Sequence, residues 1–228
     1  MSLSPATFTF LKDLAAHNDR EWFAANKPRY TAAHEDVIAL ADAVLDRLSF
    51  HDEIETPTGK KAVMRIYRDV RFSKNKAPYK TNFGMSFKRA GQLRRGGLYV
   101  HIEPGNCFVG GGFWGPERDD LKRMRDEIAR DAAPLRAILA ADSFVEHFGQ
   151  LEGDQLKTAP KGFDKEHPDI DLLRYKQYLL SENFTDKEAK AKDFPARVDA
   201  CFRAMRPFLD WASETLTTDA NGVSLYGE

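Results

Sequence analysis

The chain has 228 residues, and its 34 Lys and Arg residues nearly balance its 35 Asp and Glu residues, for a formal net charge of −1. Hydrophobic residues make up 42% and charged residues 30%, which excludes a disordered, collagen-like or fibrous chain. No apolar run approaches the roughly 20 residues that a membrane span needs, and the two cysteines form no close pair. We therefore expect a cytoplasmic protein without membrane association, disulfide framework or cofactor.

Residues 4–50 have the spacing of helices. Pro5 follows a serine, the usual order of a helix cap and first helical residue. Asn18 or Asp19 is expected to cap a second helix, and Pro28 can open a third with a long apolar stripe. The N-terminal part is therefore predicted to be helical.

The period changes from 3.6 residues to two between residues 61 and 114. The predicted strands cover residues 62–72, 82–88, 98–103 and 107–113. Each of the first three has one apolar and one polar face. That alternation is typical of an antiparallel meander with helices on one side.

The remaining chain is less regular. Residues 116–173 are read as mixed helical, residues 175–182 as a possible further strand, and residues 193–217 as a C-terminal helix that Pro207 should kink. The predicted fold class is α+β, with an antiparallel meander sheet of four to five strands flanked by N-terminal and C-terminal helices. A single domain over residues 1–228 is the simplest organisation.

Charge is concentrated in one segment, residues 60–95. It holds twelve basic residues and a single acidic one, Asp69, so it carries +11 while the rest of the chain carries −12. Such a segment attracts phosphates and other anions. The alternative is a basic face that docks onto acidic helices of the same chain.

The centre of this segment reads Arg-Ile-Tyr-Arg-Asp-Val-Arg-Phe. On a strand, Arg65, Tyr67, Asp69 and Arg71 would share one face, because side chains repeat every two residues. Two guanidinium groups on one face can hold a phosphate or carboxylate bidentately. Asp69 between them could orient the arginines or act as a base.

Arg68 would point to the opposite, apolar face. A buried arginine needs a charged partner, and Glu21 is the candidate. Lys76 and Lys80 fall in the following turn, where the chain could fold over a bound anion. An ion-pair network that locks the sheet to the helices is the structural alternative.

The chain resembles a known bacterial family, the domain of unknown function 2461. The central run from Arg65 to Tyr79 carries the resemblance, together with the segments 18–27, 110–114 and 160–163. It extends over nearly the whole chain. The resemblance implies a bacterial protein with one cytoplasmic domain and identifies no substrate.

His101 and Glu103 are two residues apart on one predicted strand face, and Tyr99 lies on the same face. They could form an acid–base pair or line the arginine site. A metal site needs more ligands than this face supplies, so none is predicted. The glycine run at residues 110–112 is read as a bulge and tight turn before a helix rather than an anion cradle.

Three functions remain open. We favour a site for a phosphorylated or carboxylated small molecule on the arginine-rich sheet face. The alternatives are a nucleic-acid module, since aromatics alternate with the charges, and a structural protein whose basic segment is an internal ion-pair network. The expected ligand-binding residues are Arg65, Tyr67, Arg68, Arg71, Lys76, Tyr79, Lys80, Tyr99 and Glu103, and the candidates for proton transfer are Asp69 and His101.

Overall fold

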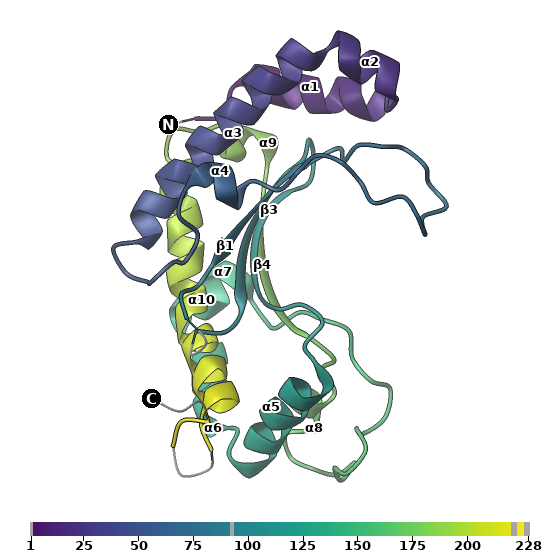
Figure 1. The fold of residues 1–228 in the computed structure, drawn as a ribbon. Helices are drawn as coiled ribbons and strands as arrows, with labels where there is room; N and C mark the ends of the chain where they lie inside the picture. The colour runs from purple at the N-terminus through teal and green to yellow at the C-terminus, as the bar shows by residue number, and fades with distance from the viewer. Residues whose placement is uncertain (1, 92–93, 220–222, 226–228) are drawn as a thin grey trace. The chain divides into compact units, whose positions relative to one another are not determined.

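The computed structural model describes residues 2–91, 94–219 and 223–225 (Figure 1). Its described residues form ten helices and one four-stranded antiparallel sheet, with helices at both termini. The helices are α1 (Pro5–Ala16), α2 (Arg20–Ala25), α3 (Lys27–Leu48), α4 (Gly59–Ala62), α5 (Arg118–Arg130), α6 (Ala133–Leu139), α7 (Asp142–Phe148), α8 (Ile170–Leu173), α9 (Asp186–Ala189) and α10 (Phe194–Thr217). The predicted α+β fold class is confirmed.

The sheet is a meander in which neighbouring strands follow one another along the chain, in the order β1-β2-β3-β4. The strands are β1 (Phe83–Lys88), β2 (Gly97–Ile102), β3 (Cys107–Phe113) and β4 (Tyr178–Phe184). The alternation predicted for β1 and β2 is present, because the apolar residues at every second position are buried. The possible strand at residues 175–182 corresponds to β4, which begins three residues later.

The first two helices begin where their capping residues predict. The Ser4 hydroxyl accepts a hydrogen bond from the N–H of Ala6 at 3.2 Å. The Asp19 carboxylate accepts one from the N–H of Trp22 at 2.8 Å. Each cap satisfies an N–H that has no partner inside the helix.

The strand predicted at residues 62–72 is wrong. Residues 59–62 form the short helix α4, and the following residues make only isolated bridges, Val63 with Met85 and Tyr67 with Tyr79. Ile66 is buried while its neighbours are exposed. An extended segment that buries one face has the same two-residue period as a sheet strand, so the sequence pattern did not distinguish them.

The described chain divides into two compact units, each made of several segments. Unit 1 comprises Met1–Phe87, Tyr99–Val109 and Asn183–Ala200, and unit 2 comprises Lys88–Leu98, Gly110–Glu182 and Cys201–Glu228. The single-domain organisation stays a prediction.

Each unit has its own apolar core. In unit 1, α1 and α3 pack against each other, with residues such as Leu14 and Val37 fully buried. In unit 2, the rings of Phe113 and Phe208 meet edge to face at 6.2 Å between centroids. Pro207 lies inside α10 as the sequence indicates. Within the described residues, none of the helices has the length and apolar character needed to span a membrane.

Candidate functional site

The segment of residues 65–80, here called the basic arm, is a loop of unit 1 that runs out and back on itself. In Figure 1 it is the blue loop that extends beyond the end of β1. Tyr67 and Tyr79 face each other as an antiparallel bridge, and the N–H of Arg68 donates to the carbonyl of Pro78 at 2.9 Å. The base of the arm is therefore held by main-chain hydrogen bonds.

Tyr79 anchors this base to the N-terminal helices. The Asn18 side chain donates to the Tyr79 carbonyl at 3.0 Å and accepts from the Tyr79 N–H at 3.1 Å. The Tyr79 ring stacks on Phe23 with centroids 4.0 Å apart and planes 14° apart. Tyr79 is buried by these contacts. The structure thus places the predicted ligand residue Tyr79 in the scaffold of the arm.

At the tip of the arm, Arg71 and Asp69 form a bidentate ion pair. Arg71 Nη2 lies 2.6 Å from Asp69 Oδ2, and Arg71 Nε lies 3.0 Å from Asp69 Oδ1. These hydrogen bonds lower the pKa of Asp69, so this carboxylate is a weak base. The side chain of Phe72, the residue after Arg71, is 96% exposed. The Lys76 ammonium group donates to the Val70 carbonyl across the tip.

Arg68 does not have the acidic partner that the sequence suggests. Its guanidinium donates to the Ala77 carbonyl at 3.3 Å and to the Ser73 hydroxyl at 3.4 Å. No ion pair with Glu21 is present among the described residues. Arg68 is half-buried rather than inside a core, so carbonyl and hydroxyl acceptors can take the place of an acidic partner.

Other cations of the arm are open to solvent. Arg65 and Lys74 are exposed, and within the described chain neither belongs to an ion pair. Lys80 is half-buried, and its pKa is lowered by burial and by the positive charge of Arg65. The arm therefore presents positive charge that the chain itself does not neutralise.

A second group of predicted residues forms a hydrogen-bonded chain on β2 and the residue after it. The Tyr99 hydroxyl lies 2.9 Å from His101 Nδ1, and His101 Nε2 lies 3.2 Å from Glu103 Oε2. Asn82 Nδ2, another donor, lies 3.3 Å from the same Nδ1. Two donors facing Nδ1 assign the proton of neutral His101 to Nε2, where Glu103 accepts it.

Neighbouring groups determine the protonation states of Glu103 and His101 in this hydrogen-bonded row. Glu103 also accepts from the Thr81 hydroxyl at 2.8 Å and from Asn106 at 2.9 Å, and such bonds lower its pKa despite burial. The His101 ring stacks on Phe108 at 4.7 Å, and burial lowers the pKa of His101 below its usual value of 6.5. His101 is thus neutral and oriented at pH 7, as a proton acceptor must be.

The two groups of predicted residues are separate in their contacts. Among the described residues, no hydrogen bond, ion pair or ring contact joins Arg65 or Arg71 to the chain of Tyr99, His101 and Glu103. The expectation that all of them line one face of the sheet depended on the incorrect strand at residues 62–72.

A groove of about 840 Å³ lies beside the arm, between it and the start of α2. Arg20 and Lys76 line it, and so do the acidic residues Asp19 and Glu21. Its mixed charge does not select an anion. The positive charge available to a ligand is instead on the exposed part of the arm.

The C-terminal part of the basic segment serves unit 2 internally. Arg89, whose side chain is fully buried, pairs with Asp210 of α10. Arg95 pairs with Asp120 of α5, and its N–H donates to the Ser213 hydroxyl at 2.7 Å. The structural alternative considered for the basic segment therefore holds for these two arginines.

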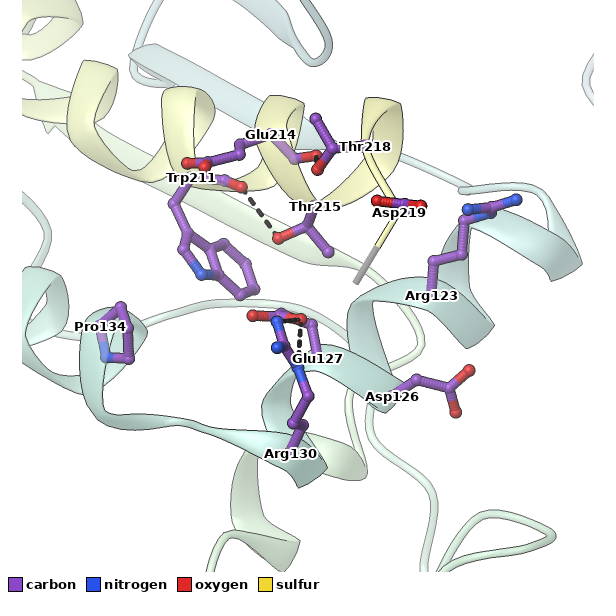
Figure 2. A pocket seen from close by; sticks show the side chains of 10 residues that line it. All are labelled: Arg123, Asp126, Glu127, Arg130, Pro134, Trp211, Glu214, Thr215, Thr218 and Asp219. Carbon is purple, nitrogen blue, oxygen red and sulfur yellow. Dashed lines mark hydrogen bonds and ion pairs between the residues drawn. The ribbon is translucent and has the colours of Figure 1, made fainter. Parts of the chain in front are cut away.

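Unit 2 contains a cleft of about 520 Å³ between α5, α6 and α10 (Figure 2). The Trp211 side chain points into it toward Glu127, which pairs with Arg130 at 2.5 Å. The lining includes four acidic residues, Asp126, Glu127, Glu214 and Asp219, against two arginines. None of the residues predicted from the sequence lines this cleft, and its acidic character disfavours an anionic ligand.

Unit 2 also brings together His147, Glu182 and Cys201, a cluster that no sequence motif predicted. These residues lie on α7, β4 and α10, at least 19 positions apart, so no local spacing indicated them. Burial raises the pKa of the Cys201 thiol and raises that of Cys107 to about 11. Neither thiol is therefore activated as a nucleophile.

Comparison with known proteins identifies the family but no characterised relative. Neither the curated proteins nor the solved structures contain a significant match. A family model described as "Conserved hypothetical protein (DUF2461)" matches residues 6–211, which include the basic arm, the Tyr99–His101–Glu103 chain and most of α10. The match covers nearly the full length of the chain, which therefore belongs to the DUF2461 family.

Proposed function

We propose that the basic arm binds single-stranded nucleic acid. In this proposal Arg65 and Lys74 contact backbone phosphates, and Phe72 stacks on a base. The observation that carries the proposal is the position of Phe72, which is 96% exposed at the tip of an anchored loop rich in unneutralised cations. Charged grooves with protruding aromatic rings are typical of proteins that bind single strands.

The exposure of the arm favours a polymer over a small anion. A small-molecule site encloses most of its ligand surface, whereas Arg71 is 77% exposed at its side chain and Phe72 is nearly fully exposed. An extended polyanion gains from several separated cations without needing a cavity. The sheet-face site for a phosphorylated or carboxylated molecule is therefore the weaker proposal.

Other features are compatible with this role. The net charge of −1 would weaken non-specific attraction to nucleic acid, so binding would depend on the local charge of the arm. Both cysteines are free thiols, as is usual in the reducing cytoplasm where we propose that the protein acts.

Fluorescence anisotropy with a labelled single-stranded oligonucleotide tests the proposal. Phe72→Ala should weaken binding roughly 5- to 150-fold, since one stacked base contributes about 1–3 kcal/mol. Phe50→Ala is the matched control, because Phe50 is 87% exposed on the same unit but lies outside the arm. Equal binding by all three proteins, or no binding by the wild type at low salt, would exclude the proposal.

The salt dependence of oligonucleotide binding distinguishes direct phosphate contacts by the arm from an attraction due to the overall charge of the protein. The double variant Arg65→Gln/Lys74→Gln should reduce the slope of log affinity against log salt by about 1.4, at roughly 0.7 for each phosphate that is no longer neutralised. Lys122→Gln/Lys165→Gln removes the same charge from exposed positions of unit 2 and should leave the slope unchanged. Equal changes in both double variants would contradict a role specific to the arm.

We further propose His101, rather than Asp69, as the residue able to transfer a proton. Its ring is held between Tyr99 and Glu103, while the Asp69 carboxylate is occupied by Arg71. Incubation of the protein with a bound oligonucleotide, followed by gel analysis, tests whether the oligonucleotide is cleaved. Cleavage by the wild type and not by His101→Gln would support it, and the absence of cleavage leaves the arm as a binding element only.

A further inference from the structure

We propose that His147, Glu182 and Cys201 bind one zinc ion in unit 2, independently of the proposed nucleic-acid site. One nitrogen, one oxygen and one sulfur donor, His147 Nδ1, Glu182 Oε2 and Cys201 Sγ, lie within 4.8 Å of one another. Zn²⁺ is the common biological cation that accepts this mixed set of donors.

Three separate elements position the donors. His147 is in the last turn of α7, Glu182 is on β4, and Cys201 is on α10. His147 Nδ1 lies 2.6 Å from Glu182 Oε2, and Cys201 Sγ lies 2.9 Å from the same oxygen and 4.0 Å from His147 Nδ1. The three atoms thus converge on one point, although the residues are far apart in the sequence.

The distances are close to those of a tetrahedral zinc site. With bonds of about 2.0–2.3 Å to zinc, the donor atoms of a tetrahedron are about 3.3–3.7 Å apart. The two shorter separations would have to widen by about 1 Å or less, a change that side-chain torsions can absorb. No main-chain rearrangement is required.

The cluster is free of competing cations and is reachable from solvent. Glu182 has His147 and Cys201 as its hydrogen-bond partners in the described chain, and no Lys or Arg pairs with it there. The side chains of His147 and Glu182 are 22% and 28% exposed, while Cys201 is buried. Three protein donors with an accessible side leave a fourth position for water, as in open zinc sites.

Cobalt substitution provides a direct test on the full chain. The protein is treated with a chelator, dialysed, and titrated with Co²⁺. A thiolate-to-cobalt charge-transfer band that saturates at one equivalent and is displaced by Zn²⁺ is expected for the wild type. Cys201→Ser should abolish the band. Cys107→Ser is the matched control, because Cys107 is equally buried but lies in unit 1, and it should keep the band.

Two further variants guard against loss of folding. His147→Gln and Glu182→Gln change partly exposed side chains, and circular dichroism should show both to be folded. Zn²⁺ should raise the melting temperature of the wild type and of Cys107→Ser, and should raise that of the two folded variants by much less. A wild type without a cobalt band, or a melting shift that persists in His147→Gln and Glu182→Gln, would show that the three residues form a hydrogen-bonded cluster only.

Discussion

Asn18 binds both main-chain groups of Tyr79, although 61 residues separate them. Its side-chain amide makes the two hydrogen bonds to Tyr79 that the main chain of a neighbouring strand would otherwise make at the base of the basic arm. The sequence left Asn18 and Asp19 open as alternative caps of α2, and the structure gives the two residues different roles. Asp19 caps α2, and Asn18 holds the arm.

Asn18→Ala should release the base of the arm. The variant removes two hydrogen bonds to half-buried main-chain groups, and we expect the free energy of unfolding to fall by about 2 kcal/mol. Hydrogen exchange of the Tyr79 amide should become faster. Asn75→Ala removes a bond of 2.9 Å to the Ala77 N–H at the exposed tip and should cost under about 0.5 kcal/mol. Similar losses of stability in both variants would contradict the anchoring role of Asn18.

Arg89→Met should destabilise unit 2, because it leaves Asp210 without its buried partner. Asp210 is 47% exposed and keeps its pair with Arg206, so the expected loss is that of a charge-assisted hydrogen bond from a buried guanidinium, about 1.5–3 kcal/mol. Urea denaturation measures it. Arg206 pairs with the same carboxylate at 3.2 Å from a more exposed position, so Arg206→Gln should cost at most about 0.5 kcal/mol. If Arg89→Met left the free energy of unfolding unchanged, the burial of Arg89 would not determine how much its ion pair stabilises the protein.

Gly112→Ala should be far more damaging than Gly115→Ala. Both glycines have positive φ, +112° and +62°, but a Cβ at Gly112 would lie 2.2 Å from the carbonyl oxygen of Tyr178, while one at Gly115 meets nothing within 4 Å. Gly115→Ala should cost about 1–2 kcal/mol from backbone strain alone. Gly112→Ala should cost more than about 4 kcal/mol or prevent folding. Expression and urea denaturation compare the two, and equal stability would refute the close approach of β3 to β4.

His101 should titrate below pH 6.5 in the folded protein, because burial opposes its protonation. The unfolded chain then binds more protons than the folded chain between the folded pKa and 6.5. Stability should therefore decrease as the pH falls from 6.5 through this window. NMR titration measures the pKa, and denaturation at several pH values compares the wild type with His101→Gln. A folded pKa above 6.5, or identical pH dependence in both proteins, would contradict this.

Local signals in the sequence determined much of the fold. The caps of α1 and α2 require only neighbouring residues, and the alternation in β1 and β2 reflects one buried face at a time. The strand expected at residues 62–72 failed because main-chain pairing, unlike burial, has no signature in a single segment. An extended loop with one buried residue such as Ile66 reads like a strand.

The sequence pointed to individual residues of the candidate site, but it did not predict which of them contact one another. The hydrogen-bonded row of Tyr99, His101 and Glu103 follows from their period-two spacing along β2 and the residue after it, whereas the ion pair of Arg71 with Asp69 depends on the conformation of the loop at the tip. The partner of Arg89 lies 121 residues away, and the cluster at His147 spans three elements. Such contacts follow from tertiary packing, which the sequence pattern does not encode locally.

The contacts of the arm tip have an evolutionary consequence. From residue 69 to residue 77 the hydrogen bonds are local, as in the pair of Asp69 with Arg71 and the bond from Lys76 to Val70, and Phe72 contributes nothing to a core. Substitutions there would cost the fold little. We therefore expect selection to act on the exposed tip chiefly through what it touches outside the molecule, so that variation among relatives at these positions would reflect the partner more than the fold.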